Sequence, residues 1–160
     1  MLSDSALQAQ LRMAPSAGTN RLGIHVDIPP FDDLRVRQAI ATAIDKQAIV
    51  QKRSGTVTAL EGHFTPPMLQ YDPDFKSNYQ YDVETAKGLM AEAGYADGIE
   101  GVKFYIGQDQ EVGQLIQADL AAIGIATELM VGSGKIGACH SVRRYSTLYV
   151  WLGRQFPRCL

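Results

Sequence analysis

Side chains that could bind a metal or start a reaction are scattered through this 160-residue sequence. Cys139 and Cys159 do not complete a zinc-binding pattern with His140, and the histidines lack the short spacing of metal ligands. No serine or cysteine lies in the sharp glycine-flanked turn that exposes a catalytic nucleophile. We therefore expect neither a metal site nor a cofactor. The three histidines are His25, His63 and His140.

Two other short patterns could carry chemistry, and both fall short. The segment 132–137, GSGKIG, looks like a phosphate loop, but Leu129 stands where that loop needs glycine and no Ser or Thr follows Lys135. Glu61 and His63 could form a catalytic pair, but solvated side chains are expected in their long loop. The aromatic residues in and just after this loop, residues 54–80, could line a cleft, although packing within the loop is the favoured interpretation. These aromatic residues are Tyr71, Phe75, Tyr79 and Tyr81.

The densest group of charges lies in the segment 29–50, PPFDDLRVRQAIATAIDKQAIV. Its two prolines favour an extended approach, after which Asp32 or Asp33 can cap a helix by accepting from its free backbone N–H groups. Arg35 and Arg37 follow within the first turn, where they can pair with the same carboxylates. We interpret these charges as helix framework, not as ligand chemistry.

Composition limits the class of protein. A hydrophobic fraction of 46% and a charged fraction of 20% are ordinary for one soluble globular domain. The net charge of −2 argues against nucleic acid as a partner. No apolar run approaches the roughly 20 residues needed to cross a bilayer. Residues 1–16 lack the basic start and apolar block of a secretory signal, so we expect the chain as expressed to stay in the cytoplasm.

The charge distribution divides the chain near residue 130. Residues 1–128 hold 17 acidic and 10 basic side chains, whereas residues 129–160 hold five basic ones and no acidic one. Both cysteines and the single tryptophan, Trp151, also lie in this last segment. Such a basic tail is either a binding arm or a segment foreign to the preceding design.

Hydrophobic periodicity predicts an α/β fold in which helices cover a mixed or parallel sheet. Asp45 is unfavourable within a helix but a good cap, so we expect a bend there between two helices. The segment 54–80 has no steady period and is predicted to be irregular. We expect strands near 21–26, 102–106 and 125–131, and helices over 3–11, 34–44, 46–53, 82–93 and 109–123. The tail 132–160 has no comparable pattern, although STLYVWL at 146–152 could form a strand.

Four linked segments resemble the peptide/nickel class of extracellular solute-binding proteins of ABC transporters. These are NRLGIHVDIPPFDDLRVRQAIATAIDKQAIV, TPPMLQYDPDF, YDVETAKGLMAEAGYADG and LIQADLAAIGIATEL, which together span about residues 20–130. The resemblance implies one lobe of a two-lobed fold resembling periplasmic binding proteins. It also implies that the full-length protein is periplasmic or extracellular, binds a peptide or similar small solute without catalysis, and delivers it to a membrane permease.

The sequence departs from that pattern at its two ends. We expect residues 1–19 to be a leading helix and linker, 20–130 to be part of the C-terminal lobe, and 131–160 to be an aberrant tail. The family's cleft motif, rich in Trp and Gly and carrying an aspartate, is represented here by LYVWLGRQFPRCL. A permitted codon set for residues 150–159, shifted by one nucleotide, encodes Phe-Gly-Trp-Gly-Ala-Asn-Phe-Pro-Asp-Ala. We therefore predict a frameshifted tail.

The resemblance implies that Trp151 is the residue of this chain that contacts ligand, and that the chain alone binds weakly or not at all. Two alternatives stay open. One is a small α/β enzyme that uses the 54–80 loop, which would need clustered titratable groups with shifted pKa values. The other is an interaction module that presents the arginines of the basic tail, namely Arg143, Arg144, Arg154 and Arg158.

Overall fold

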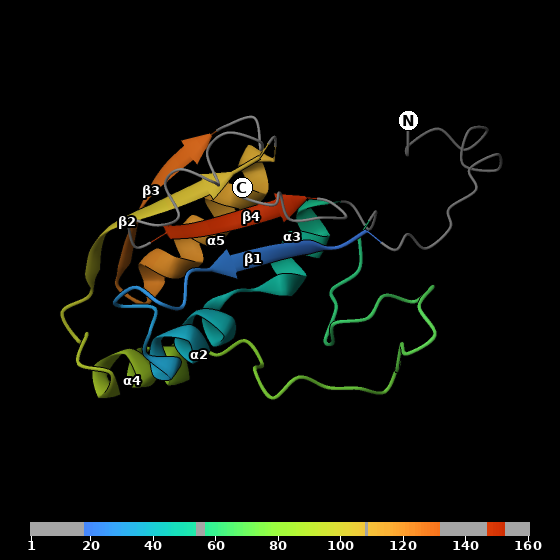
Figure 1. Cartoon of the computed structure of the whole chain (residues 1–160), viewed down its shortest axis with the longest axis horizontal. Coiled ribbons are helices and arrows are strands. Elements are labelled where there is room, and N and C mark those ends of the chain that lie inside the picture. Colours follow the sequence, from blue (N-terminus) through green and yellow to red (C-terminus); the bar gives the residue numbers. More distant parts are fainter. Residues whose placement is uncertain (1–17, 54–56, 108, 132–146, 153–160) are drawn as a thin grey trace.

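The computed structural model describes residues 18–53, 57–107, 109–131 and 147–152. Figure 1 shows the four strands lying side by side, with α3 and α5 behind them and α2 and α4 below them in this view. The expected helix over 3–11 lies outside the described residues. In chain order the elements are β1 (Asn20–Ile24), α2 (Leu34–Ala43), α3 (Lys46–Lys52), α4 (Val83–Glu92), β2 (Ile99–Ile106), α5 (Gln110–Ala122), β3 (Ile125–Val131) and β4 (Thr147–Leu152).

The strands form one mixed sheet with the order β1-β4-β2-β3. Strand β2 runs parallel to both β3 and β4, whereas β1 runs antiparallel to β4. The predicted α/β lobe with a mixed sheet is therefore confirmed, and the three strands near 21–26, 102–106 and 125–131 lie in one sheet. The strand that the sequence left open in 146–152 is present as β4.

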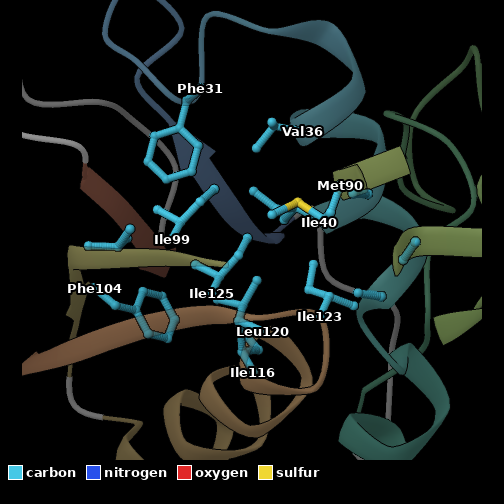
Figure 2. Packing of buried hydrophobic residues seen from close by; sticks show 14 of the residues in the cluster. Phe31, Val36, Ile40, Met90, Ile99, Phe104, Ile116, Leu120, Ile123 and Ile125 are labelled. Carbon is cyan, nitrogen blue, oxygen red and sulfur yellow. The ribbon is translucent and has the colours of Figure 1, made fainter. Parts of the chain in front are cut away.

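Strand β2 supplies the centre of the core because its side chains alternate between the two faces of the sheet. Val102, Phe104 and Ile106 are buried, whereas Lys103 and Tyr105 between them are half-exposed. Figure 2 shows how the apolar side chains of β2, β3 and α5 meet those of α2 and α4. The buried set includes Phe31, Val36, Ile40, Met90, Ile99, Phe104, Ile116, Leu120, Ile123 and Ile125.

The aspartates begin the helices as the sequence predicts. Asp33 caps α2 by accepting from the Arg35 N–H at 2.8 Å. Asp45 ends the extended break after α2 and caps α3, accepting from the backbone N–H groups of Gln47 at 2.9 Å and Ala48 at 3.0 Å. The predicted bend at Asp45 is therefore confirmed, and the boundaries of the four predicted helices within the described residues differ from the observed ones by at most one residue.

Two helices end at glycines because the next backbone step is left-handed. Gly94 follows α4 with φ of 88°, and Gly124 follows α5 with φ of 85°. The carbonyl of Gly124 also accepts from the Ile99 N–H at 2.9 Å, which brings the start of β2 beside the turn into β3. A Cβ on Gly98 would lie 2.5 Å from that carbonyl oxygen, so this approach requires glycine.

The boundaries of two strands differ from the predicted ones. Strand β1 ends at Ile24, two residues early, because the chain turns there towards Phe31, whose N–H donates to the Ile28 carbonyl. Strand β2 begins at Ile99, before the alternating apolar pattern, because a register shift between Ile99 and Val102 extends its pairing with β3.

No helix among the described residues is long and apolar enough to cross a membrane.

A carboxylate joins α5 to the bend between α2 and α3. Asp119 of α5 accepts from the Asp45 N–H at 3.1 Å. Burial raises the pKa of the Asp119 carboxyl, the hydrogen bond from Asp45 lowers it, and the negative charge of the Asp45 side chain raises it further. The contact therefore joins two elements through a carboxyl whose charge is unfavourable in the fold.

Two helical glycines should respond oppositely to alanine. A Cβ on Gly113 in α5 would lie 2.6 Å from Cδ1 of the buried Ile106, so Gly113→Ala should cost about 1–3 kcal/mol through overpacking. Gly88 in α4 has open space around its Cα, so Gly88→Ala should stabilise by about 1 kcal/mol. Urea unfolding of the two variants measures both effects. A gain for Gly113→Ala would contradict the packing of α5 on β2.

Two aspartates should show opposite trends with pH. The folded pKa of Asp119 lies above its usual value of 3.8, so the charged carboxylate costs stability as pH rises through that window. The side-chain hydrogen bond from Arg35 lowers the pKa of Asp33 to about 2, so its stabilisation is present above 3.8 and is lost as pH falls towards 2. At neutral pH, Asp119→Asn should stabilise by less than about 1 kcal/mol, and Asp33→Asn should destabilise.

Asparagine keeps one acceptor oxygen at both positions. At position 33 it also removes one of the two oxygens that accept from Arg35, so the loss there combines charge and hydrogen bonding. Thermal unfolding of the two variants across the acidic range measures both effects, and both differences from the parent chain should shrink in strong acid. If the unfolding temperature of both variants changed in the same direction at neutral pH, the pKa shift of one of the two carboxyls would have the wrong sign.

Candidate functional site

The topology brings the carboxyl ends of three strands to one edge of the sheet. Strands β2, β3 and β4 are mutually parallel in direction and end at Ile106, Val131 and Leu152. Because β1 is antiparallel to β4, its first residue, Asn20, lies opposite Leu152 at the same edge. Ligands of open α/β sheets bind outside the carboxyl ends of the strands. We call this edge, formed by residues 20–21, 106–107, 131 and 151–152, the carboxyl edge.

Trp151, the predicted ligand contact, lies at the carboxyl edge. It is the penultimate residue of β4 and is aligned with Arg21 in the ladder between β1 and β4. The backbone position suits a ligand contact, and the predicted role of Trp151 stays a prediction. Residues 153–160, which include the rest of the Trp- and Gly-containing motif, lie outside the described residues.

Helix α5 begins beside the carboxyl edge. The end of α3 lies against the start of α5. Asp109 caps α5 by accepting from the Val112 N–H at 3.5 Å, and it forms an ion pair with Arg53. Lys52 approaches Glu111 at 3.6 Å. Both cations at the end of α3 therefore face acids of the first turn of α5. Sequence reasoning missed these pairs because Arg53 and Asp109 are 56 positions apart in the chain and neither residue shows its partner locally.

The charges at the start of α2 hold the fold together, as predicted. Arg35 donates from Nη2 to Asp33 Oδ2 at 2.6 Å and also hydrogen-bonds the Glu92 carbonyl at the end of α4. Arg37 donates from Nη1 to the carbonyl of Phe31 at 2.7 Å and to that of Asp32 at 2.9 Å. These guanidinium groups are engaged by the chain's own oxygens, so they are framework.

The long loop is anchored by Glu61. Its carboxylate accepts from the Ser77 N–H at 3.2 Å and from Gln80 Nε2 at 3.4 Å, and Lys46 of α3 approaches at 3.9 Å. Glu61 is thus a tether of the loop, whereas His63 is exposed. This arrangement does not favour the Glu61–His63 catalytic pair that the sequence left possible.

The aromatic residues of the loop pack only in part. The Phe75 ring contacts Gly62, and Tyr79 Oη accepts a hydrogen bond from Gln38 at 3.4 Å, yet both side chains stay almost half-exposed. Figure 1 shows the green segment that holds them extending away from the sheet. The predicted packing is therefore incomplete. Phe64, Met68, Leu69 and Tyr81 are also exposed.

The other sequence candidates do not assemble a site within the described part of the chain. No group of three or more His, Cys, Asp or Glu residues there could hold a metal ion. The phosphate-loop-like segment 132–137, His140 and both cysteines fall outside the described residues.

Most of this chain matches a known protein family. The family model described as bacterial extracellular solute-binding proteins, family 5 Middle, matches residues 3–151. The chain belongs to this family. The matched range exceeds the segment 20–130 that carries the resemblance, and it includes β4 up to Trp151.

Relatives of this solute-binding chain bind different small molecules. Di/tripeptide-binding protein 2 of Pseudomonas aeruginosa is 35% identical over 150 residues, which cover 84% of this chain and 27% of the relative. Heme-binding protein A of Haemophilus influenzae is 35% identical over 115 residues, covering 66% and 21%. The chain thus spans about a quarter of the length of these curated relatives.

A solved relative supports the fold. The periplasmic binding protein DppA of Helicobacter pylori, solved with the peptide STSA, superposes with a TM-score of 0.75 at 24% identity, over 88% of this chain and 28% of that one. At this identity the likeness concerns the fold, which is that of one lobe of a periplasmic binding protein.

Removing the tether should loosen the loop without unfolding the lobe. Glu61→Ala removes the acceptor of the Ser77 N–H, so the Ser77 amide should exchange with solvent hydrogen faster, at a cost below about 1 kcal/mol in global stability. Glu84→Ala, which removes an exposed pair with Lys87 on α4, is the matched control. Unchanged Ser77 exchange in Glu61→Ala would contradict the tether.

Proposed function

We propose that this solute-binding chain is the ligand-contacting lobe of an ABC-transporter subunit that carries a small peptide or similar solute to a membrane permease without chemical conversion. The observation that carries this proposal is the family match over residues 3–151, on a lobe whose parallel strands end together at one edge. The full-length protein would act in the periplasm, the compartment named for the Helicobacter pylori relative.

A peptide is the favoured ligand because the di/tripeptide-binding relative aligns over most of this chain. The heme-binding relative has the same identity over a shorter stretch, so heme is the second candidate. An enzymatic role is disfavoured by the position of Glu61, whose carboxylate is occupied by the loop. The interaction-module alternative depends on arginines in the segments 132–146 and 153–160, which the structure does not describe.

The carboxyl edge would supply one wall of the binding site, with Trp151 as the expected contact. Strong capture of a small solute requires burial of most of its surface. A single lobe leaves its half of the site hydrated, so hydrogen bonds and ion pairs there are screened and each contributes little. We therefore expect the second lobe of the family fold to complete the site, and the lobe alone to bind weakly.

Peptide titration of the 160-residue chain tests this function. Triglycine should perturb backbone amide resonances at the carboxyl edge with a dissociation constant of about 1 mM or weaker. Trp151 is the only tryptophan, so its emission gives a second readout. Micromolar binding would overturn the half-site. A lack of any perturbation at the edge, with hemin as well as triglycine, would overturn solute binding by this lobe.

The predicted frameshift concerns residues 131–160 and stays a proposal. Its support is the compositional break near residue 130 and the cleft-like motif encoded one nucleotide away. Strand β4 and the family match up to residue 151 are compatible with either origin, because an apolar segment can occupy a strand position in any reading frame. The nucleotide sequence around codons 128–160 decides. Codons that give no family-like motif in the shifted frame would dismiss the proposal.

A further inference from the structure

Arg21 lies at the carboxyl edge because β1 runs against β4. The register aligns Arg21 with Trp151 and Asn20 with Leu152, so the first residues of β1 accompany the last residues of β4. Figure 1 shows the start of β1 beside the arrowhead of β4. A cation is therefore fixed by strand pairing next to the residue expected to contact ligand.

Arg21 differs from the other cations near this edge. Lys52 and Arg53 face Glu111 and Asp109 of α5. Arg21 is exposed, and its Nε donates to Thr19 Oγ1 at 3.1 Å. Among residues 18–53, 57–107, 109–131 and 147–152, no carboxylate forms an ion pair with it.

The chemistry of this cation selects its ligand. A guanidinium offers parallel N–H donors that match the two oxygens of a carboxylate, and such bidentate pairs are stronger than neutral hydrogen bonds. The contact with Thr19 uses Nε, and within the described part of the chain neither Nη group donates a hydrogen bond. Because Thr19 holds one side of the guanidinium, the remaining donors need less ordering when a ligand arrives.

We infer that Arg21 binds the carboxylate of the transported solute, which for a peptide is its C-terminal group. This inference rests on the proposed function, since it places a solute at the carboxyl edge. It adds that the solute is an acid and that its carboxylate meets the β1 side of that edge, beside the end of β4.

N-acetylglycine and N-acetylglycinamide form a matched pair of probes, because they differ only in the carboxylate. Titrated into the 160-residue chain, N-acetylglycine should shift the Arg21 Nε–Hε resonance and the amides of residues 19–22, and N-acetylglycinamide should leave them unchanged. Arg21→Gln should weaken the amide shifts of residues 19–22 by about tenfold in apparent affinity. Arg21→Lys should give an intermediate loss, because it keeps the charge without the bidentate geometry.

Lys76→Gln is the control, because it removes the same charge from an exposed position in the loop. It should bind N-acetylglycine as the parent chain does. Equal shifts with both probes, equal binding by Arg21→Gln, or inorganic phosphate binding as strongly as N-acetylglycine would overturn the assignment. Triglycine binding that survives Arg21→Gln would overturn it and leave the proposed function standing. Probe binding at Arg21 without any response to triglycine or hemin would overturn the proposed function and the solute assignment, and would leave only carboxylate binding by Arg21.

Discussion

The apolar side of β2 is the contact on which the rest of the lobe depends. Val102, Phe104 and Ile106 project from one face of the strand and are buried to within a few per cent of their surface. Covering that row requires α5 to lie close along the sheet, and the absence of a side chain at Gly113 makes room for Ile106. Once α5 lies there, the following strand returns parallel to β2, because a helix that spans the sheet brings the chain back to its starting side. The part of the carboxyl edge formed by β2 and β3 follows from this packing arrangement.

Local signals in the sequence were sufficient for the elements but not for their pairing. Asp33, Asp45 and Asp82 each accept from backbone N–H groups in the first turn of a helix, which is a property of the next few residues only. Alternating side chains likewise reveal β2 without knowledge of its neighbours. The insertion of β4 between β1 and β2 depends on residues more than 40 positions apart, and no local pattern contains that information. The ion pair between Arg53 and Asp109 was unpredictable for the same reason.

The candidate site was predictable only where a resemblance supplied it. Trp151 was singled out by a motif, and strand pairing then placed it at the carboxyl edge beside Arg21. Arg21 itself carries no sequence signal, because an isolated arginine in a short strand resembles any solvated charge. Its interest arises when the cations of α2 and α3 are assigned partners. Arg35 and Arg37 bind oxygens around α2, and Lys46 approaches the loop carboxylate of Glu61.

The division between framework charges and site charges explains why such a lobe can bind without reacting. A carboxylate engaged by framework donors is stabilised in its ionised form, so it is a poor proton donor and a poor base. Asp33 is an example, because the side-chain hydrogen bond from Arg35, and then the capping hydrogen bond from the Arg35 N–H, lower its pKa. Asp119 is an exception, because burial raises its pKa. Its carboxylate nevertheless already accepts from the Asp45 N–H, at the bend between α2 and α3. A cation at an open strand end has the opposite character, because its energy of interaction with an anion is small in water and rises when water is removed. Closure of a second wall over the carboxyl edge would therefore strengthen the contact with Arg21 more than it would strengthen the framework pairs, which are made before ligand arrives. In the proposed arrangement, affinity would therefore come from closure over the carboxyl edge.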